Sequence, residues 1–107
     1  MEARKVGSIG VDSGTVLLTD PCYGIPTDEI YEQLDTALTA STGKGDMAIA
    51  VRSGYGDGVY PVWGVFASHE ETKMGERCLA VLCDFSDGGV VGSVLGGAIA
   101  AYTLSQF

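Results

Sequence analysis

Three glycines alternate with other residues in the run SGYGDG from Ser53 to Gly58, just before the strand-like segment VYPV. Glycine at this spacing lets the backbone adopt positive φ angles and leaves N–H groups open to a ligand or a neighbouring segment. The spacing is similar to that of phosphate-binding loops, but those loops lead into the N-terminus of a helix. Because a strand-like segment follows here, the run predicts a hairpin with a bulge that presents Tyr55.

Side chains suited to binding a small ligand surround this run. Tyr55 lies between two glycines, where a turn cannot bury it, and Arg52 is close enough in sequence to join it on a planar ligand. Basic residues flank the glycine-rich half of the chain, so the ligand would be anionic, for example nucleotide-like. The predicted ligand-binding residues are Arg52, Tyr55, Gly56, Asp57, Gly58 and Tyr60.

A catalytic thiol is the weakest of the functional hypotheses. Cys22 stands in the sequence Asp-Pro-Cys-Tyr and would need a histidine to activate it. The single histidine of the chain, His69, has no motif that links it to Cys22. Since free cysteines are most often small buried hydrophobic residues, the sequence predicts no catalytic residue.

No set of side chains has the spacing of a metal site. His69, Glu70 and Glu71 are adjacent, but a metal site needs three or four ligands and no second cluster accompanies them. Three aspartates that could meet at one end of a sheet each lie beside a turn, where the carboxylate ordinarily hydrogen-bonds its own backbone. These aspartates are Asp20, Asp57 and Asp84. We therefore expect neither a metal nor another cofactor.

The chain is acidic, with a net charge of −8 over 107 residues and no lysine or arginine between Val6 and Gly43. Such a charge repels phosphate backbones and anionic lipids, so neither a nucleic-acid polymer nor a membrane is an expected partner. The three cysteines have no metal-like spacing, and the first residues lead directly into a strand pattern instead of a secretory signal. Both features favour free thiols in a cytoplasmic protein.

Hydrophobic periodicity predicts one amphipathic helix. Its apolar stripe consists of Ile30, Leu34, Ala37 and Leu38, and the helix is expected to run from Thr27 to Ser41. A helix with one apolar stripe must pack on a sheet.

Apolar and β-branched runs bounded by turn residues predict the strands of that sheet. A turn at residues 12–14 would join the first two strands as a hairpin, and the last strand is apolar enough to be central. A polar loop at residues 68–76 would precede the last strand. The predicted strands are Lys5 to Val11, Thr15 to Thr19, Met47 to Arg52, Val59 to Ala67 and Arg77 to Phe85.

The tail from Val90 to Phe107 carries no charged side chain. Gly88, Gly92 and Gly96 are four residues apart, a spacing found where membrane helices pack together. The uninterrupted apolar stretch is nevertheless shorter than the ~20 residues that a spanning helix needs. We therefore expect residues 88–107 to form terminal strands, a strand exchanged with another subunit, or an oligomer contact.

Three short motifs, VDSG at 11–14, LTDPCY at 18–23 and GDGVYPV at 56–62, resemble a family of uncharacterised bacterial and phage proteins. The strand AVLCDF at 80–85 is similar to the last element of that pattern, and the resemblance covers roughly residues 6 to 85. It implies a compact, mostly β fold and carries no assigned reaction. Membership in a phage family would suit a protein that sequesters a host signalling nucleotide, although the acidic charge opposes an anionic ligand.

Together these features predict a single small α+β domain, with an antiparallel and curved sheet of about five to seven strands and one amphipathic helix packed on it. The leading hypothesis is a non-catalytic binding protein that forms homo-oligomers and holds a small ligand at residues 53–58. The alternative is a protein–protein interaction module that uses the apolar tail and exposed tyrosines. A small thiol enzyme using Cys22 ranks last.

Overall fold

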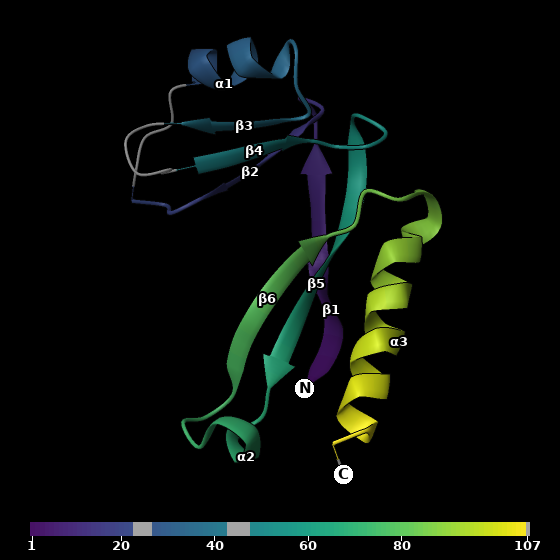
Figure 1. Ribbon diagram of the computed structural model, residues 1–107. Coiled ribbons are helices and arrows are strands. Elements are labelled where there is room, and N and C mark those ends of the chain that lie inside the picture. Colours follow the sequence, from purple (N-terminus) through teal and green to yellow (C-terminus); the bar gives the residue numbers. More distant parts are fainter. Residues whose placement is uncertain (23–26, 43–47, 107) are drawn as a thin grey trace. The chain divides into compact units, whose positions relative to one another are not determined.

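The computed structural model describes residues 1–22, 27–42 and 48–106 and confirms an α+β fold (Figure 1). The strands form two antiparallel three-stranded sheets. The chain divides into two compact units, one made of Met1–Gly10 with Val59–Phe107 and the other of Val11–Gly58. We call them the terminal unit and the central unit and describe each by itself. That the whole chain forms one domain stays a prediction.

The terminal unit has the strand order β1-β5-β6, in which β5 lies between the other two strands. A short helix connects β5 to β6, and a single 3-10 turn leads from β6 towards the C-terminal helix (Figure 1). Its elements are β1 (Glu2–Val11), β5 (Gly58–Ala67), α2 (His69–Thr72), β6 (Arg77–Cys83), η1 (Asp87–Gly89) and α3 (Val90–Leu104).

Helix α3 packs against this sheet at both of its ends. Near its start, Gly92 lies against the indole ring of Trp63 on β5, so closely that a Cβ atom at Gly92 would come within 2.7 Å of ring atom Cδ1. Near its end, the Thr103 hydroxyl donates a 2.6 Å hydrogen bond to the Met1 carbonyl. On β5, Tyr60 is buried and meets the Phe85 ring edge-to-face at a centroid distance of 5.3 Å.

The central unit packs α1 (Thr27–Leu34) on a sheet with the strand order β2-β4-β3. Its strands are β2 (Thr15–Thr19), β3 (Thr39–Thr42) and β4 (Ala48–Arg52). The core consists of Ile30, Leu34, Ala40 and Ala50. The helix contributes the two large residues, and the small alanines on β3 and β4 let it lie close to the sheet.

The predicted helix from Thr27 to Ser41 is too long, because α1 ends at Leu34 and residues from Thr39 form β3. Ile30 and Leu34 are buried as expected, whereas Leu38 is 76% exposed. Pairing of β3 with β4 satisfies the backbone of residues 39–42 in a ladder and buries Ala40. Strand pairing therefore outweighs the helical spacing of the apolar residues after Leu34.

The predicted hairpin at residues 12–14 is also wrong. Strand β2 pairs with β4, whereas β1 belongs to the other sheet. Gly14, at a φ of 64°, lies in the segment that joins β1 to β2, and these two strands are not paired with each other. The alternation of apolar and polar residues predicted that each strand exists. Which strand it pairs with depends on how the other strands of the sheet are arranged.

Two further expectations about the terminal unit are corrected. Strand β6 lies at the edge of its sheet and not at the centre, with Leu79 and Val81 more than half exposed. The tail forms the helix α3 and not terminal strands. Glycine lowers helix propensity by only about 1 kcal/mol, which contact between the helix and the sheet can offset.

Candidate functional site

The glycine-rich run forms a closed turn at the end of β4. The Ser53 hydroxyl is buried and donates a 2.6 Å hydrogen bond to the Gly56 carbonyl, while the Gly56 N–H donates to the Ser53 carbonyl at 3.2 Å. The Ser53 N–H donates to the Gly14 carbonyl at 3.0 Å, which ties the turn to the start of β2. Gly56 has a φ of 79°, a conformation that favours glycine. The turn leaves Tyr55 71% exposed, as the sequence predicts.

This turn is not the predicted bulged hairpin. It leads from β4 to β5, and these strands belong to different sheets. Asp57 and Gly58 complete the run, and both are exposed. A hypothetical Cβ atom at Gly14 would lie 3.9 Å from the Asp57 carboxylate, which places Asp57 beside the start of β2.

Arg52 makes a contact within the central unit, and its part in ligand binding stays a prediction. Its guanidinium donates a 3.4 Å hydrogen bond to the Leu34 carbonyl, at the C-terminal end of α1. A cation at that end also complements the helix dipole. Its backbone N–H donates to the Leu38 carbonyl at 2.9 Å. Arg52 thus secures the segment between α1 and β3, and the exposed side chains of the predicted site are those of Tyr55 and Asp57.

Tyr60 belongs to the terminal unit, where it is buried against Phe85. The structure therefore gives Tyr60 a role in packing. Arg52, Tyr55, Gly56, Asp57 and Gly58 lie in the central unit. The predicted site residues do not all come together within one unit.

The groups considered for catalysis lie in different units. Cys22 is exposed in the central unit, and its backbone N–H donates to the Asp20 carboxylate at 2.9 Å. His69 lies in the terminal unit, where its Nδ1 accepts a 2.9 Å hydrogen bond from the Gly75 N–H. Within the described residues, no group of three or more His, Cys, Asp or Glu side chains could hold a metal.

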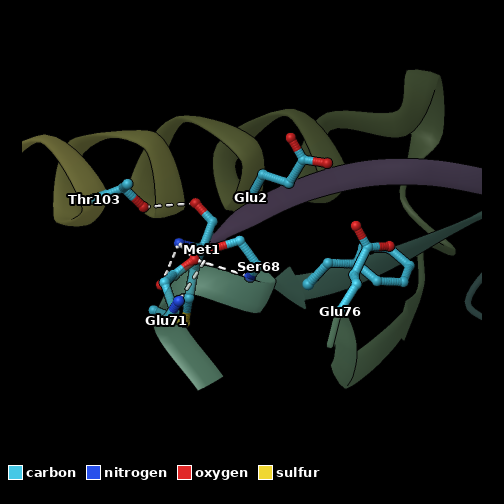
Figure 2. Close-up of a pocket in the computed structure, with 7 residues that line it drawn as sticks. Met1, Glu2, Ser68, Glu71, Glu76 and Thr103 are labelled. Carbon is cyan, nitrogen blue, oxygen red and sulfur yellow. Dashed lines mark hydrogen bonds and ion pairs between the residues drawn. The ribbon is translucent and has the colours of Figure 1, made fainter. Parts of the chain in front are cut away.

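A pocket of about 310 Å³ lies where the start of β1 meets α2 and α3 (Figure 2). The Met1 amine donates to both carboxylate oxygens of Glu71, at 2.7 and 2.8 Å. Arg4 pairs with Glu2 at 2.5 Å and with Glu76 at 2.6 Å, and its guanidinium lies 3.8 Å from the centroid of the Phe66 ring. The residues that line the pocket are Met1, Glu2, Phe66, Ser68, Glu71, Glu76 and Thr103.

The charges around this pocket are paired with one another. The hydrogen bond from the N-terminal amine is the main reason that the pKa of Glu71 lies below its ordinary value, and the Ser68 N–H adds to it. Hydrogen bonds to Glu76 and Glu2 raise the pKa of Arg4. Glu71 also completes a capping box with Ser68 at the start of α2. Each of these charged groups therefore already has an ion-pair partner at the pocket, and Glu2 and Glu76 share Arg4.

Asp84 is the most deeply buried charged residue of the described chain and is 1% exposed. One carboxylate oxygen accepts a 2.9 Å hydrogen bond from the Ser86 N–H and a short one from the Ser86 hydroxyl. The other oxygen accepts a 2.7 Å hydrogen bond from the Gly92 N–H in the first turn of α3. Burial raises the pKa of Asp84, but these hydrogen bonds outweigh it and the net pKa lies below the ordinary value.

The sequence predicted that Asp84 hydrogen-bonds the backbone of a neighbouring turn, and the hydrogen bond from the Ser86 N–H confirms this, but the bond from the Gly92 N–H at the start of α3 was not predicted. The signal that could have found it is an aspartate and a serine shortly before a long apolar run, which is typical of a helix start. The carboxylate joins the end of β6 to the start of α3 and thereby fixes where the helix begins.

The outward side of α3 is apolar. No charged residue occurs between Val90 and Leu104, and Gly92 is the only buried residue of the helix. Its exposed fractions include 66% for Val94, 52% for Tyr102 and 76% for Leu104. A helix on the surface of a globular protein ordinarily has a polar outer face, so this face is unusual.

The segment Asp87–Leu104 is long and apolar enough to cross a membrane, judged by length and composition alone. Gly88 and Gly89, the last two residues of η1, have positive φ angles that interrupt the helical conformation before α3, whose continuous helix has 15 residues. At 1.5 Å per residue such a helix is about 22 Å long, less than the ~30 Å of a hydrocarbon core.

Comparison of the chain with protein-family models, with curated proteins and with solved structures gave no match.

Proposed function

We propose that this protein is a non-catalytic protein–protein interaction module and that the outward face of α3 is its contact surface. One observation carries the proposal, namely a 15-residue helix without charge whose only buried residue is Gly92. An exposed apolar face of this kind marks an interaction site in a folded protein.

The positions of the exposed side chains suggest how a partner binds. Val90, Val94, Ala98 and Ala101 recur at intervals of three or four residues, which places them on one side of the helix. The partner would therefore offer an apolar groove into which α3 fits, a common mode of helix recognition. Tyr102 follows on the same side with an aromatic ring that is half exposed.

The experiment compares the proteins that three immobilised forms retain from a native lysate. The forms are the wild type, Val94→Lys on α3, and Leu18→Lys on β2 as the matched control. Both substitutions introduce the same charge at exposed apolar side chains, 66% and 55% exposed. We expect a protein that the wild type and Leu18→Lys retain and Val94→Lys loses. With that protein purified, Val94→Lys should raise the dissociation constant at least tenfold.

Two results would contradict the proposal. One is retention of the same proteins by all three forms. The other is binding of the wild type to phosphatidylcholine vesicles with no protein partner, which would assign α3 to a lipid surface.

A second candidate function is binding of a small nucleotide-like ligand at the Ser53–Gly58 turn. The exposure of Tyr55 favours it, because an accessible aromatic ring can stack on a base. A thermal-shift panel of nucleotides should then raise the melting temperature, and Tyr55→Ala should abolish the shift. The absence of a shift with every nucleotide would count against this function.

A further inference from the structure

Strand β6 has one free edge. It lies outermost in the order β1-β5-β6, and in the described part of the chain its ladder partner is β5 alone (Figure 1). The backbone N–H and C=O groups on its other side are therefore open to pairing with a further strand.

This edge lacks the features that protect edge strands from association. No charged residue or proline occurs from Cys78 to Cys83, and every residue from Arg77 to Val81 is exposed. The opposite edge of the same sheet, β1, carries Glu2, Arg4 and Lys5. Charged side chains and prolines are the usual protection of an edge, so the two edges differ in the property that controls association.

A bulge limits which part of β6 can pair regularly. Ala80 lies opposite Val65 and Cys78 lies opposite Phe66, so Leu79 is the additional residue. The regular part of the strand therefore follows Leu79, and Val81 lies within it with 61% of its surface exposed.

We propose that β6 pairs antiparallel with β6 of a second copy of this chain, about a two-fold axis near Val81. The two three-stranded sheets would then become one continuous sheet. This proposal uses an element other than α3, so it is independent of the proposed function.

The charges at the two ends of β6 favour a second copy as the occupant. Arg77 begins the strand, Asp87 follows its end, and neither side chain has an ion-pair partner among the residues that the structure describes. Antiparallel pairing places the Arg77 end of one strand beside the Asp87 end of the other, twice in each dimer. A symmetric contact uses the same surface on both copies, so it satisfies both open edges at once.

The test measures molecular mass by light scattering over a range of protein concentrations, with reductant present so that the exposed thiols form no disulfide. We expect the wild type to have twice the 11.1 kDa mass of one chain. Val81→Lys should be a monomer, because it places two like charges directly opposite each other at the axis.

Two controls separate this contact from others. Val6→Lys introduces the same charge on β1 at a side chain that is 54% exposed, and it should remain a dimer. Val94→Lys, which tests the α3 surface, should also remain a dimer. A monomeric wild type, or a dimer that survives Val81→Lys and is lost with Val94→Lys, would overturn the proposal.

Hydrogen exchange of the unaltered protein provides a measurement that does not depend on how the variants fold. The backbone amides of Val81 and Cys83 face the open edge, because they alternate with the Asp84 N–H that donates to Pro61 on β5. These two amides should exchange more slowly as the protein concentration rises. Exchange rates in β6 that do not change across the concentration range would contradict pairing at this edge.

Discussion

Gly92 permits a close contact between α3 and β5 in the terminal unit. The indole of Trp63 occupies the space where a side chain would begin, and its Nε1 is buried with no hydrogen-bond partner within the described residues. Gly96, one turn later on the same helix, has nothing within 4 Å of a hypothetical Cβ atom. Of these two glycines, only Gly92 lies against a side chain of the sheet and lets α3 approach it closely.

Replacing Gly92 with alanine should destabilise the protein, since the new methyl group would force α3 and Trp63 apart. Such overpacking costs about 1–3 kcal/mol. Gly96→Ala is the matched control, and it should be neutral or stabilise by up to ~1 kcal/mol through higher helix propensity. Urea unfolding of the two variants and the wild type would measure both changes. Equal stabilities for Gly92→Ala and Gly96→Ala would show that the close contact is absent.

Asp84 makes the stability of the protein depend on pH. Its pKa in the folded state lies below the ordinary value of 3.8, so its carboxylate contributes stability above that value. The contribution is lost as the pH falls through the lower, folded-state pKa, when the carboxylate takes up a proton.

We expect Asp84→Asn to be less stable than the wild type near neutral pH, by about 1.5–3 kcal/mol for hydrogen bonds to a charged group. The difference between the two proteins should shrink as the pH is lowered below 3.8. Melting temperatures measured from pH 7 to pH 3 would show this convergence. Asp12→Asn, at an exposed bend after β1, serves as the control. A difference that stays constant over this range would contradict the role of the carboxylate.

At the scale of elements, the end of α1 shows how strand pairing sets a helix boundary. The residues after Leu34 keep the apolar spacing of a helix, yet Thr39–Thr42 pair with β4 and Leu38 lies exposed. The hydrogen bond from Arg52 to the Leu34 carbonyl comes from β4 and caps the helix at its actual end.

Two substitutions on the same predicted apolar stripe should therefore differ strongly in their effect on the free energy of unfolding. Leu34→Ala removes a side chain that is 3% exposed and should cost about 2–5 kcal/mol of stability. Leu38→Ala alters a side chain that is 76% exposed and should change stability by no more than about 0.5 kcal/mol. Chemical unfolding of both variants and the wild type would measure the two changes in stability. A large loss for Leu38→Ala would mean that the helix continues as the periodicity predicts.

At the scale of the whole molecule, the net charge of −8 opposes every contact between two copies. The proposed pairing of β6 must overcome this repulsion with backbone hydrogen bonds, apolar contact and the Arg77–Asp87 charges at its ends. The two proposed contact surfaces contain few charges, because α3 has none and β6 has none after Arg77.

Self-association should consequently become tighter as salt is added. Raising the ionic strength from about 0.01 M to about 0.15 M shortens the Debye length from ~30 Å to ~8 Å, which screens the repulsion between the acidic copies. Sedimentation equilibrium in the two buffers would give the dissociation constants. Weaker association at the higher salt concentration would show that local ion pairs dominate the contact.

The sequence alone determined the α+β class, the position of most strands, the start of α1 and the exposure of Tyr55 in a glycine-rich turn. These features depend on neighbours within a few residues, such as alternation along a strand, Ile30 and Leu34 one turn apart, and glycines on both sides of one tyrosine. The absence of charge in residues 90–107 was equally visible, and it is the basis of the proposal that this segment contacts a partner.

Only the tertiary structure decided which strands pair, where α1 stops, and that the apolar tail is a helix. Strand β2 pairs with β4 and not with β1, which precedes it in the sequence. The start of α3 is fixed by the hydrogen bond from the Gly92 N–H to Asp84 and by the contact of Gly92 with the Trp63 ring. Each of these outcomes depends on competing contacts between residues that are far apart in the sequence. Local spacing cannot rank such contacts, because their free energies depend on which surfaces the rest of the fold brings together.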